Sequence, residues 1–148
     1  MKVKLTDRMP MHGILRVRVF RKGKLVDRRE DRNLIVSGGR TAAAALVAGM
    51  GKDKHISKIA FGTNGLPPTP DDTEITGAFV KGFSDITFPQ VGLASFHWEL
   101  TETEANGLKI IEFGLLCEDG TLWSRKIWED ALKKGPYISL SGEWLIEH

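Results

Sequence analysis

The sequence predicts a mainly β fold: an antiparallel β-sandwich, or a partly open barrel, with one short α-helix near residues 38–49. Three observations lead to this prediction. Apolar and polar residues alternate in several short segments, as in strands with one buried and one exposed face. Glycine turns separate such segments, among them Asn106-Gly107 and Asp119-Gly120. Only one segment, an alanine run, has the composition of a helix.

The first expected element is a hairpin that follows an extended arm. Residues 1–13 contain turn residues and no periodicity, so we expect an arm there and one domain over 14–148. From residue 14 the chain alternates, with Leu15, Val17 and Val19 expected on the buried side. A short turn with a glycine then leads into a returning strand, which completes a β-hairpin.

The helix is expected directly after a buried apolar strand at 33–36. Ser37 is expected to cap it by accepting a hydrogen bond from a free N–H of the first turn. Gly49 or Gly51 would end it in a left-handed conformation. Its small alanine side chains imply close packing on a sheet.

The remainder of the chain is expected to form strands. Three prolines make 63–73 a loop, because proline cannot complete regular strand pairing. Asn106-Gly107 predicts a hairpin between the strands on either side of it, and Asp119-Gly120 predicts a second one. The expected strands lie at 56–62, 75–86, 91–100, 109–116, 121–127 and 137–146.

The composition is that of one soluble globular domain. Of 148 residues, 41% are hydrophobic and 27% are charged, which excludes a fully disordered chain. No stretch approaches the ~20 apolar residues of a membrane helix, and the N-terminus lacks the apolar run of a secretory signal. The single cysteine, Cys117, cannot form an internal disulfide. We therefore expect synthesis and folding in a cytoplasm.

Charge is distributed unevenly along the chain. Residues 1–40 carry a net charge of +8 and residues 41–148 a net charge of −6. Such asymmetry is typical of nucleic-acid-binding arms and also of complementary faces in an assembly. Only Phe20 supplies an aromatic ring near the basic run, which disfavours base stacking, so a protein partner is preferred and nucleic acid is the alternative. The predicted interface residues are Arg16, Arg18, Arg21, Lys22, Lys24, Arg28, Arg29 and Arg32.

No motif predicts catalysis, a cofactor or a metal. The turn before the helix lacks the phosphate-binding pattern, the histidines have no ligand spacing, and no neighbour activates Cys117. Asp72 or Asp71 is expected to cap a turn after Pro70. Glu112 interrupts an apolar strand, and we predict that it forms an ion pair with Arg125 on the neighbouring strand. Side chains on opposite faces of the sheet would contradict this pair.

The order of several unspecific segments across 33–146 resembles small structural proteins of tailed bacteriophages or prophages, those found with the tail fibres and baseplate. The segments are Asn33-Leu34-Ile35-Val36-Ser37-Gly38-Gly39-Arg40, Ile59-Ala60-Phe61-Gly62-Thr63-Asn64-Gly65, Pro70-Asp71-Asp72-Thr73, Glu104-Ala105-Asn106-Gly107, Ile111-Glu112-Phe113-Gly114-Leu115-Leu116, Asp119-Gly120-Thr121-Leu122-Trp123-Ser124-Arg125 and Gly142-Glu143-Trp144.

This resemblance implies a non-enzymatic subunit of the virion, made in the host bacterium. The chain is neither long nor repetitive, so a tail, baseplate or collar adaptor or a fibre-attachment protein is expected rather than a fibre shaft. A capsid decoration protein is a further alternative. The expected partners are other virion proteins and further copies of the chain, since such particles are symmetric. The resemblance carries no catalytic residue.

Overall fold

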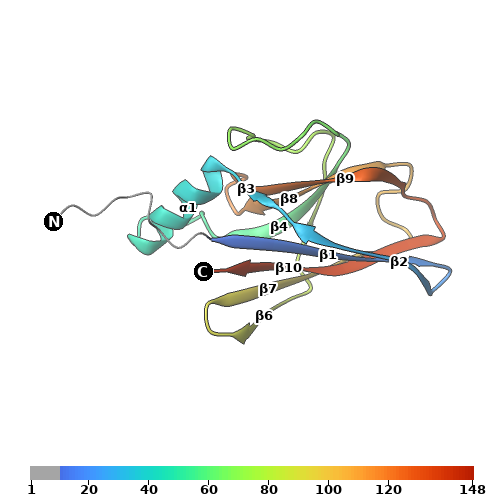
Figure 1. Ribbon diagram of the computed structural model, residues 1–148, viewed down its shortest axis with the longest axis horizontal. Coiled ribbons are helices and arrows are strands. Elements are labelled where there is room, and N and C mark those ends of the chain that lie inside the picture. Colours follow the sequence, from blue (N-terminus) through green and yellow to red (C-terminus); the bar gives the residue numbers. More distant parts are fainter. Residues whose placement is uncertain (1–10) are drawn as a thin grey trace.

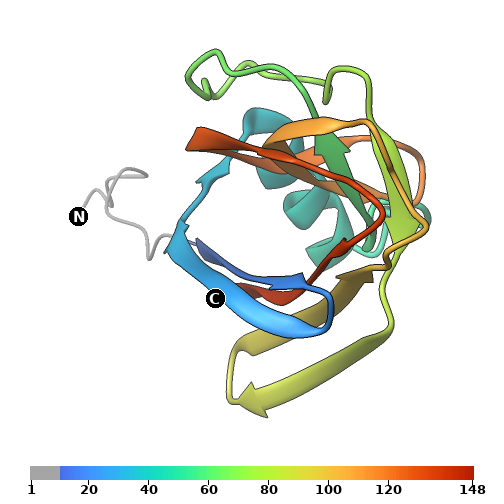
Figure 2. The ribbon, with the colours of Figure 1, turned by 90° about the vertical axis from the view of Figure 1, so that its right-hand side faces the viewer.

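The computed structural model describes residues 11–148 as two five-stranded antiparallel sheets packed into a sandwich with one short helix (Figure 1). The predicted fold class is therefore confirmed as a sandwich. Figure 2 shows the two sheets as separate layers, viewed from the end opposite the helix. The first sheet has the order β2 (Lys24–Arg32), β1 (His12–Arg21), β10 (Ile138–Glu147), β7 (Leu93–Leu100) and β6 (Asp85–Gln90). The second has the order β3 (Leu34–Ile35), β9 (Leu122–Lys133), β8 (Lys109–Cys117), β4 (Ile56–Gly62) and β5 (Phe79–Gly82).

The basic hairpin forms as predicted, from β1 and β2. Leu15, Val17 and Val19 are buried, so the alternation of β1 places them in the core. Lys22 and Gly23 have positive φ values of 48° and 79°, which matches the twist of a tight hairpin turn. The expected arm is shorter than predicted, because residues 12–13 already belong to β1 and pair with β10. Its residues 1–10 lie outside the described part.

The helix α1 (Ser37–Val47) lies close to its expected position but is not capped as expected. Val36 precedes it in an extended conformation, and no side chain makes a capping hydrogen bond. Ser37 is the first helical residue, so its predicted capping role is wrong. Gly49 has φ of 71° and ends the helix as predicted. Within residues 11–148, no helix is long and apolar enough to cross a membrane.

Two connections differ from the sequence prediction because they change sheets. The expected strand at 75–86 is divided: β5 ends in the second sheet, and β6 begins the edge of the first. The Asn106-Gly107 hairpin is also wrong, because β7 pairs with β6 and β10 whereas β8 pairs with β4 and β9. The eight residues 101–108 instead span the ~10 Å between packed sheets. Asp119-Gly120 does join a paired hairpin, β8 to β9, as predicted.

The crossing at 101–108 is held by charged side chains. The buried Lys134 donates from Nζ to the Glu102 carbonyl, the Asn106 side-chain oxygen and the Gly135 carbonyl. Burial lowers the pKa of Lys134. Lys81 Nζ lies 2.6 Å from Glu104 Oε1, which also accepts a hydrogen bond from the Thr101 amide. These contacts fix the segment that links the two layers.

Stability should therefore depend on pH through Glu104. The Lys81 hydrogen bond, opposed by burial and assisted by the Thr101 amide, lowers the pKa of Glu104 from 4.5 to about 2. A depressed pKa means that this stabilisation is complete above pH 4.5 and is lost as the pH falls towards about 2. In urea unfolding, the stability difference between the wild type and Glu104→Gln should be largest near neutral pH and should vanish towards about pH 2. A pH-independent difference for Glu104→Gln would contradict this account.

Aromatic rings fill the space between the sheets. Trp98 and Trp144 of the first sheet are almost fully buried. Phe61 of β4 contacts Trp98 edge-on with ring centroids 5.5 Å apart, and it contacts Phe113 of β8 at 5.7 Å. Such edge-to-face pairs add to the burial of apolar area. Trp98 and Trp144 thus serve as core residues.

Candidate functional site

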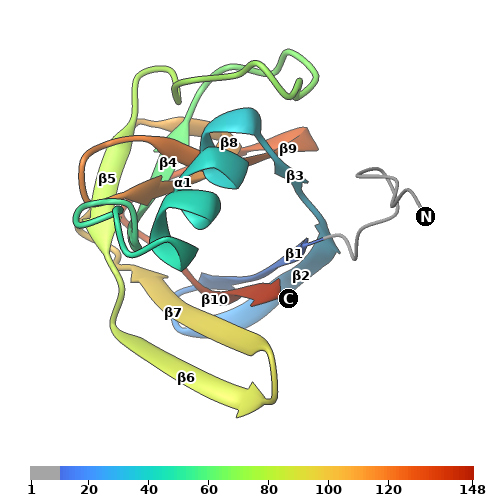
Figure 3. The same ribbon diagram turned by 90° about the vertical axis from the view of Figure 1, so that its left-hand side faces the viewer.

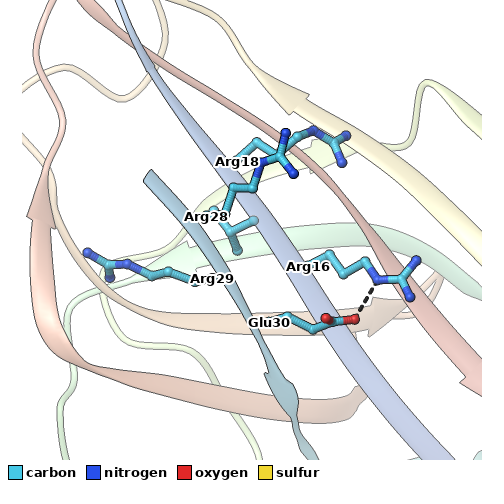
Figure 4. A pocket seen from close by; sticks show the side chains of 6 residues that line it. Arg16, Arg18, Arg28, Arg29 and Glu30 are labelled. Carbon is cyan, nitrogen blue, oxygen red and sulfur yellow. Dashed lines mark hydrogen bonds and ion pairs between the residues drawn. The ribbon is translucent and has the colours of Figure 1, made fainter. Parts of the chain in front are cut away.

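A strongly charged surface lies on the outer face of the β1–β2 hairpin. Arg16 and Arg18 alternate with the buried residues of β1 and so point outwards. Directly opposite them on β2 lie Glu30 and Arg28 respectively. These four residues, here called the basic face, border a shallow hollow of about 380 Å³ (Figure 4).

Arg16 and Arg18 are anchored to different extents. Arg18 donates from both terminal nitrogens to the Glu143 carboxylate of β10, at 3.1 and 2.8 Å, and this bidentate geometry holds its guanidinium over the sheet. Arg16 Nε lies 2.6 Å from Glu30 Oε1, but both side chains are about half exposed. Salt and water weaken such an exposed pair. The face therefore offers guanidinium groups in partly fixed positions.

Arg28 is exposed and has no ion-pair partner among residues 11–148. It stands directly opposite Arg18, and like charges at opposite positions of neighbouring strands destabilise a sheet. Among residues 11–148, Arg28 therefore makes no ion pair that would stabilise the fold. Its guanidinium group is available to a carboxylate from another molecule.

The other predicted interface residues differ in their relation to this face: Arg32 lies on the same side of β2, whereas Arg29 does not, although Arg29 also lines the hollow. Arg29 lies opposite the buried Val17 and points away from the basic face (Figure 4). It contacts Asp27 at 3.0 Å, donates to the Asp130 carbonyl at 2.9 Å and lies 5.8 Å from the centre of the Trp128 ring. Arg29 thus joins β2 to β9 within the same chain. Arg32 lies opposite Ile14 at the far end of β2, and Arg21, Lys22 and Lys24 lie at the tip of the hairpin.

The predicted ion pair between Glu112 and Arg125 is present in the second sheet. Arg125 Nε lies 2.6 Å from Glu112 Oε2, and both side chains are almost completely buried. The other carboxylate oxygen of Glu112 accepts hydrogen bonds from the amides of Asn64 and Thr76, each 3.1 Å long. The pair satisfies backbone groups of the proline loop and so fastens that loop to the sheet.

Asp72 is a partner of this pair that sequence reasoning missed. It accepts hydrogen bonds from the amide and hydroxyl of Thr69, as expected of a turn-capping residue, but its Oδ2 also lies 2.9 Å from Arg125 Nη1. Burial opposes ionisation, yet the hydrogen bonds from Thr69 and Arg125 hold the pKa of Asp72 below its ordinary value. Proximity in the sequence revealed the turn, whereas the contact with Arg125 spans 53 positions.

Cys117 and His97 both lie in strands of the sandwich, Cys117 in β8 and His97 in β7. Cys117 is fully buried, and burial raises the pKa of its thiol to about 11. His97 lies on the outer side of β7, with Nε2 3.0 Å from the Thr87 hydroxyl. Among residues 11–148, no group of three or more histidine, cysteine, aspartate or glutamate side chains is placed to hold a metal ion.

Comparison of the chain with protein-family models, with curated proteins and with solved structures found no match. Its function is therefore inferred from the surfaces of the molecule itself.

Proposed function

We propose that this chain is a non-enzymatic structural subunit of a tailed-phage particle and that it acts by binding neighbouring copies of itself through the basic face. The observation that carries the proposal is Arg28, which has no ion-pair partner among residues 11–148 and stands opposite Arg18 on an exposed edge hairpin. A partner carboxylate between the two guanidinium groups would relieve their repulsion and would gain charge-assisted hydrogen bonds. The order of sequence segments supports the phage context by resemblance.

A protein partner suits this face better than nucleic acid does. Glu30 and Glu143 lie among its arginines and would repel a phosphate backbone. Trp98 and Trp144 are buried, so they provide no surface for base stacking. The acidic remainder of the chain, residues 41–148, supplies carboxylates of the required sign on a second copy.

Reversing the charge of Arg28 tests this proposal. We expect Arg28→Glu to abolish self-association, measured as molar mass by light scattering over a range of concentrations. The monomer should be equally stable or more stable by about 0.2–1 kcal/mol, because the new carboxylate faces Arg18. Lys109→Glu is the matched control, since Lys109 stands opposite Lys133 in an exposed cross-strand pair of the same kind. It should gain the same local attraction and keep the association.

Three results would overturn the proposal. One is a wild-type chain that remains monomeric at every concentration. Another is an Arg28→Glu variant that associates as the wild type does. The third is steeply salt-dependent binding of labelled DNA that is lost in Arg28→Glu, which would favour the nucleic-acid alternative.

A further inference from the structure

The charges on the outer face of the first sheet are sorted by sign. Figure 3 shows β2, β1, β10, β7 and β6 as one layer, with α1 and the second sheet on one side of it and no other described segment on the opposite side. On that open side, Arg16, Arg18 and Arg28 lie at the β2–β1 end. The exposed Glu99 of β7 and Asp85 of β6 lie at the other end. The face therefore has a basic half and an acidic half.

One row of paired residues crosses this face and has an unpaired charge at each end. Arg28 of β2 lies opposite Arg18 of β1. Ser141 of β10 lies opposite both Arg18 and Glu99, so Glu99 points to the same side of the sheet as Arg28. Glu99 is exposed and, like Arg28, makes no ion pair within residues 11–148. With strands ~4.8 Å apart, roughly 14 Å separates the two positions, so their charges remain free for a second molecule.

A two-fold axis parallel to the strands would bring these two charges together. If the axis runs over the space between β1 and β10, it exchanges the two halves of the face and keeps each residue at its own level along the strands. Arg28 of each copy would then face Glu99 of the other. An axis across the strands would instead set the arginines of β1 and β2 against the same arginines of the second copy, and such like-charge contacts are unfavourable.

The neighbouring rows fit the same axis. Each residue of β1 would face, in the second copy, the residue with which it pairs on β10. Arg16 pairs with Glu143, so Arg16 of one copy would gain the Glu143 carboxylate of the other. Ile14 pairs with Leu145, so apolar side chains from both copies would meet. The face is therefore complementary to itself in charge and in polarity.

The acidic half offers a site for the incoming arginine. A shallow hollow of about 360 Å³ lies there, bordered by Phe20, Glu99, Thr101, Glu102, Ser139 and Ser141. Its carboxylates and hydroxyls can accept hydrogen bonds from a guanidinium group, and the Phe20 ring offers an apolar surface to the stem of the side chain. No lysine or arginine is among the described residues that line this hollow, so a second copy would supply its cation.

The face has the size and shape that a stable dimer needs. With strands ~4.8 Å apart and ~3.3 Å per residue, the five-stranded sheet presents a face of roughly 24 by 30 Å, or about 700 Å². Standard protein interfaces bury about 800 Å² on each partner. Sheets that pack face to face also keep their strands aligned within about 30°, which agrees with an axis along the strands.

We propose that two copies of this chain pack through the outer faces of their first sheets, about a two-fold axis along β1 and β10, and that Arg28 of each copy pairs with Glu99 of the other. This inference rests on the proposed function and identifies the surface of the second copy that the basic face binds. A two-fold contact uses the same surface on both copies, so the assembly closes at two chains.

Exchanging the two charges tests this pairing. Glu99→Arg should prevent association as Arg28→Glu does, because like charges would then face each other. The double variant Arg28→Glu/Glu99→Arg restores opposite signs and should regain a dimer with a dissociation constant within about tenfold of that of the wild type. Light scattering over a range of concentrations measures both effects. Arg28→Glu/Glu118→Arg is the matched control: it has the same net charge, but Glu118 lies in the exposed turn between β8 and β9, so this variant should stay monomeric.

Mixing the two single variants provides a second test that does not need the double variant. When an Arg28→Glu copy meets a Glu99→Arg copy, both contacts of the two-fold pair join opposite charges. The mixture should therefore form dimers although each variant alone is monomeric. The molar mass should reach that of two chains and should not rise further.

The outcomes separate this inference from the proposed function. A Glu99→Arg variant that associates as the wild type does would overturn the pairing, and so would a failure of both the double variant and the mixture to associate. Restoration by Glu118→Arg would overturn it as well, and in these cases the role of the basic face would stand. A wild-type mass that rises beyond two chains would overturn the two-fold axis. A monomeric wild type, or normal association of Arg28→Glu, would overturn the proposed function itself.

Discussion

Replacing Arg125 with methionine is expected to lower the free energy of unfolding by about 3–5 kcal/mol, the usual effect of removing one partner from a buried ion pair. Methionine would leave the Glu112 carboxylate buried at 0% exposure without its cation. The Asn64 carbonyl and Asp72 would lose donors as well. Urea unfolding measures this change, and the midpoint should fall with a nearly unchanged slope.

A matched control isolates the effect of burial. Arg16 and Glu30 form an ion pair with the same Nε–Oε distance of 2.6 Å, but their side chains are 48% and 56% exposed. Because water screens this pair, Arg16→Met should lower the free energy of unfolding by less than about 1 kcal/mol. Similar losses of unfolding free energy in Arg125→Met and Arg16→Met would mean that burial does not increase the cost of removing one partner of an ion pair.

The double variant Glu112→Gln/Arg125→Met keeps the test decisive if Arg125→Met does not fold. Glutamine retains an oxygen that can accept the amides of Asn64 and Thr76, and it carries no charge that needs a partner. The double variant should therefore be more stable than Arg125→Met alone. A double variant at least as unstable as Arg125→Met would contradict the role assigned to the uncompensated carboxylate.

Replacing Gly142 with alanine is expected to lower the free energy of unfolding by about 3 kcal/mol, the upper part of the range for overpacking. Gly142 lies in the central strand β10, opposite Val17 on one side and Trp98 on the other. An added Cβ would collide with the backbone carbonyl of Arg16 and would lie 2.8 Å from Cζ2 of Trp98. Neither group has room to move, because one belongs to the sheet ladder and the other to the packed core.

Gly82→Ala is the control for this prediction. Gly82 also lies in a strand, β5, but an added Cβ would meet nothing within 4 Å. Alanine there should leave stability unchanged or raise it by about 0.5–1 kcal/mol through the lower entropy of the unfolded chain. Thermal unfolding of the two variants should separate them by several degrees, since about 1 kcal/mol shifts the midpoint of a domain of this size by ~2–8 °C. Equal midpoints would show that the sheet accommodates the methyl group at Gly142.

Local sequence signals correctly predicted those structural features that are set by residues close together in the sequence or on adjacent strands. The alternation of β1 placed Leu15, Val17 and Val19 in the core, because side chains of a strand point alternately to its two faces. Glu112 was expected to need a cation because it interrupts an apolar strand, and Arg125 on the next strand is that cation. Turn chemistry located Asp119-Gly120 correctly, since its two strands are consecutive in both sequence and sheet.

These local signals could not predict the register in which β2 pairs with β1. A bulge between Val19 and Phe20 shifts the pairing by one residue, so Arg28 rather than Asp27 lies opposite Arg18. Without the bulge, Arg29 would share the outer face with Arg16. A shift of one residue exchanges the two faces of a strand, and therefore the bulge decided which of the predicted cations form the basic face.

The sequence alone thus predicted a mainly β sandwich or partly open barrel, most strand positions and one buried ion pair, because these follow from periodicity and from the need of a buried charge for a partner. The tertiary structure decided which strands are neighbours. Asn106-Gly107 has the residues of a hairpin turn but lies in a crossing between sheets, since a turn constrains its own backbone and not the sheet that each flanking strand joins. Asp72 beside Arg125 and Phe88 beside α1 likewise became neighbours only when the two layers packed, because such contacts join segments distant in the sequence.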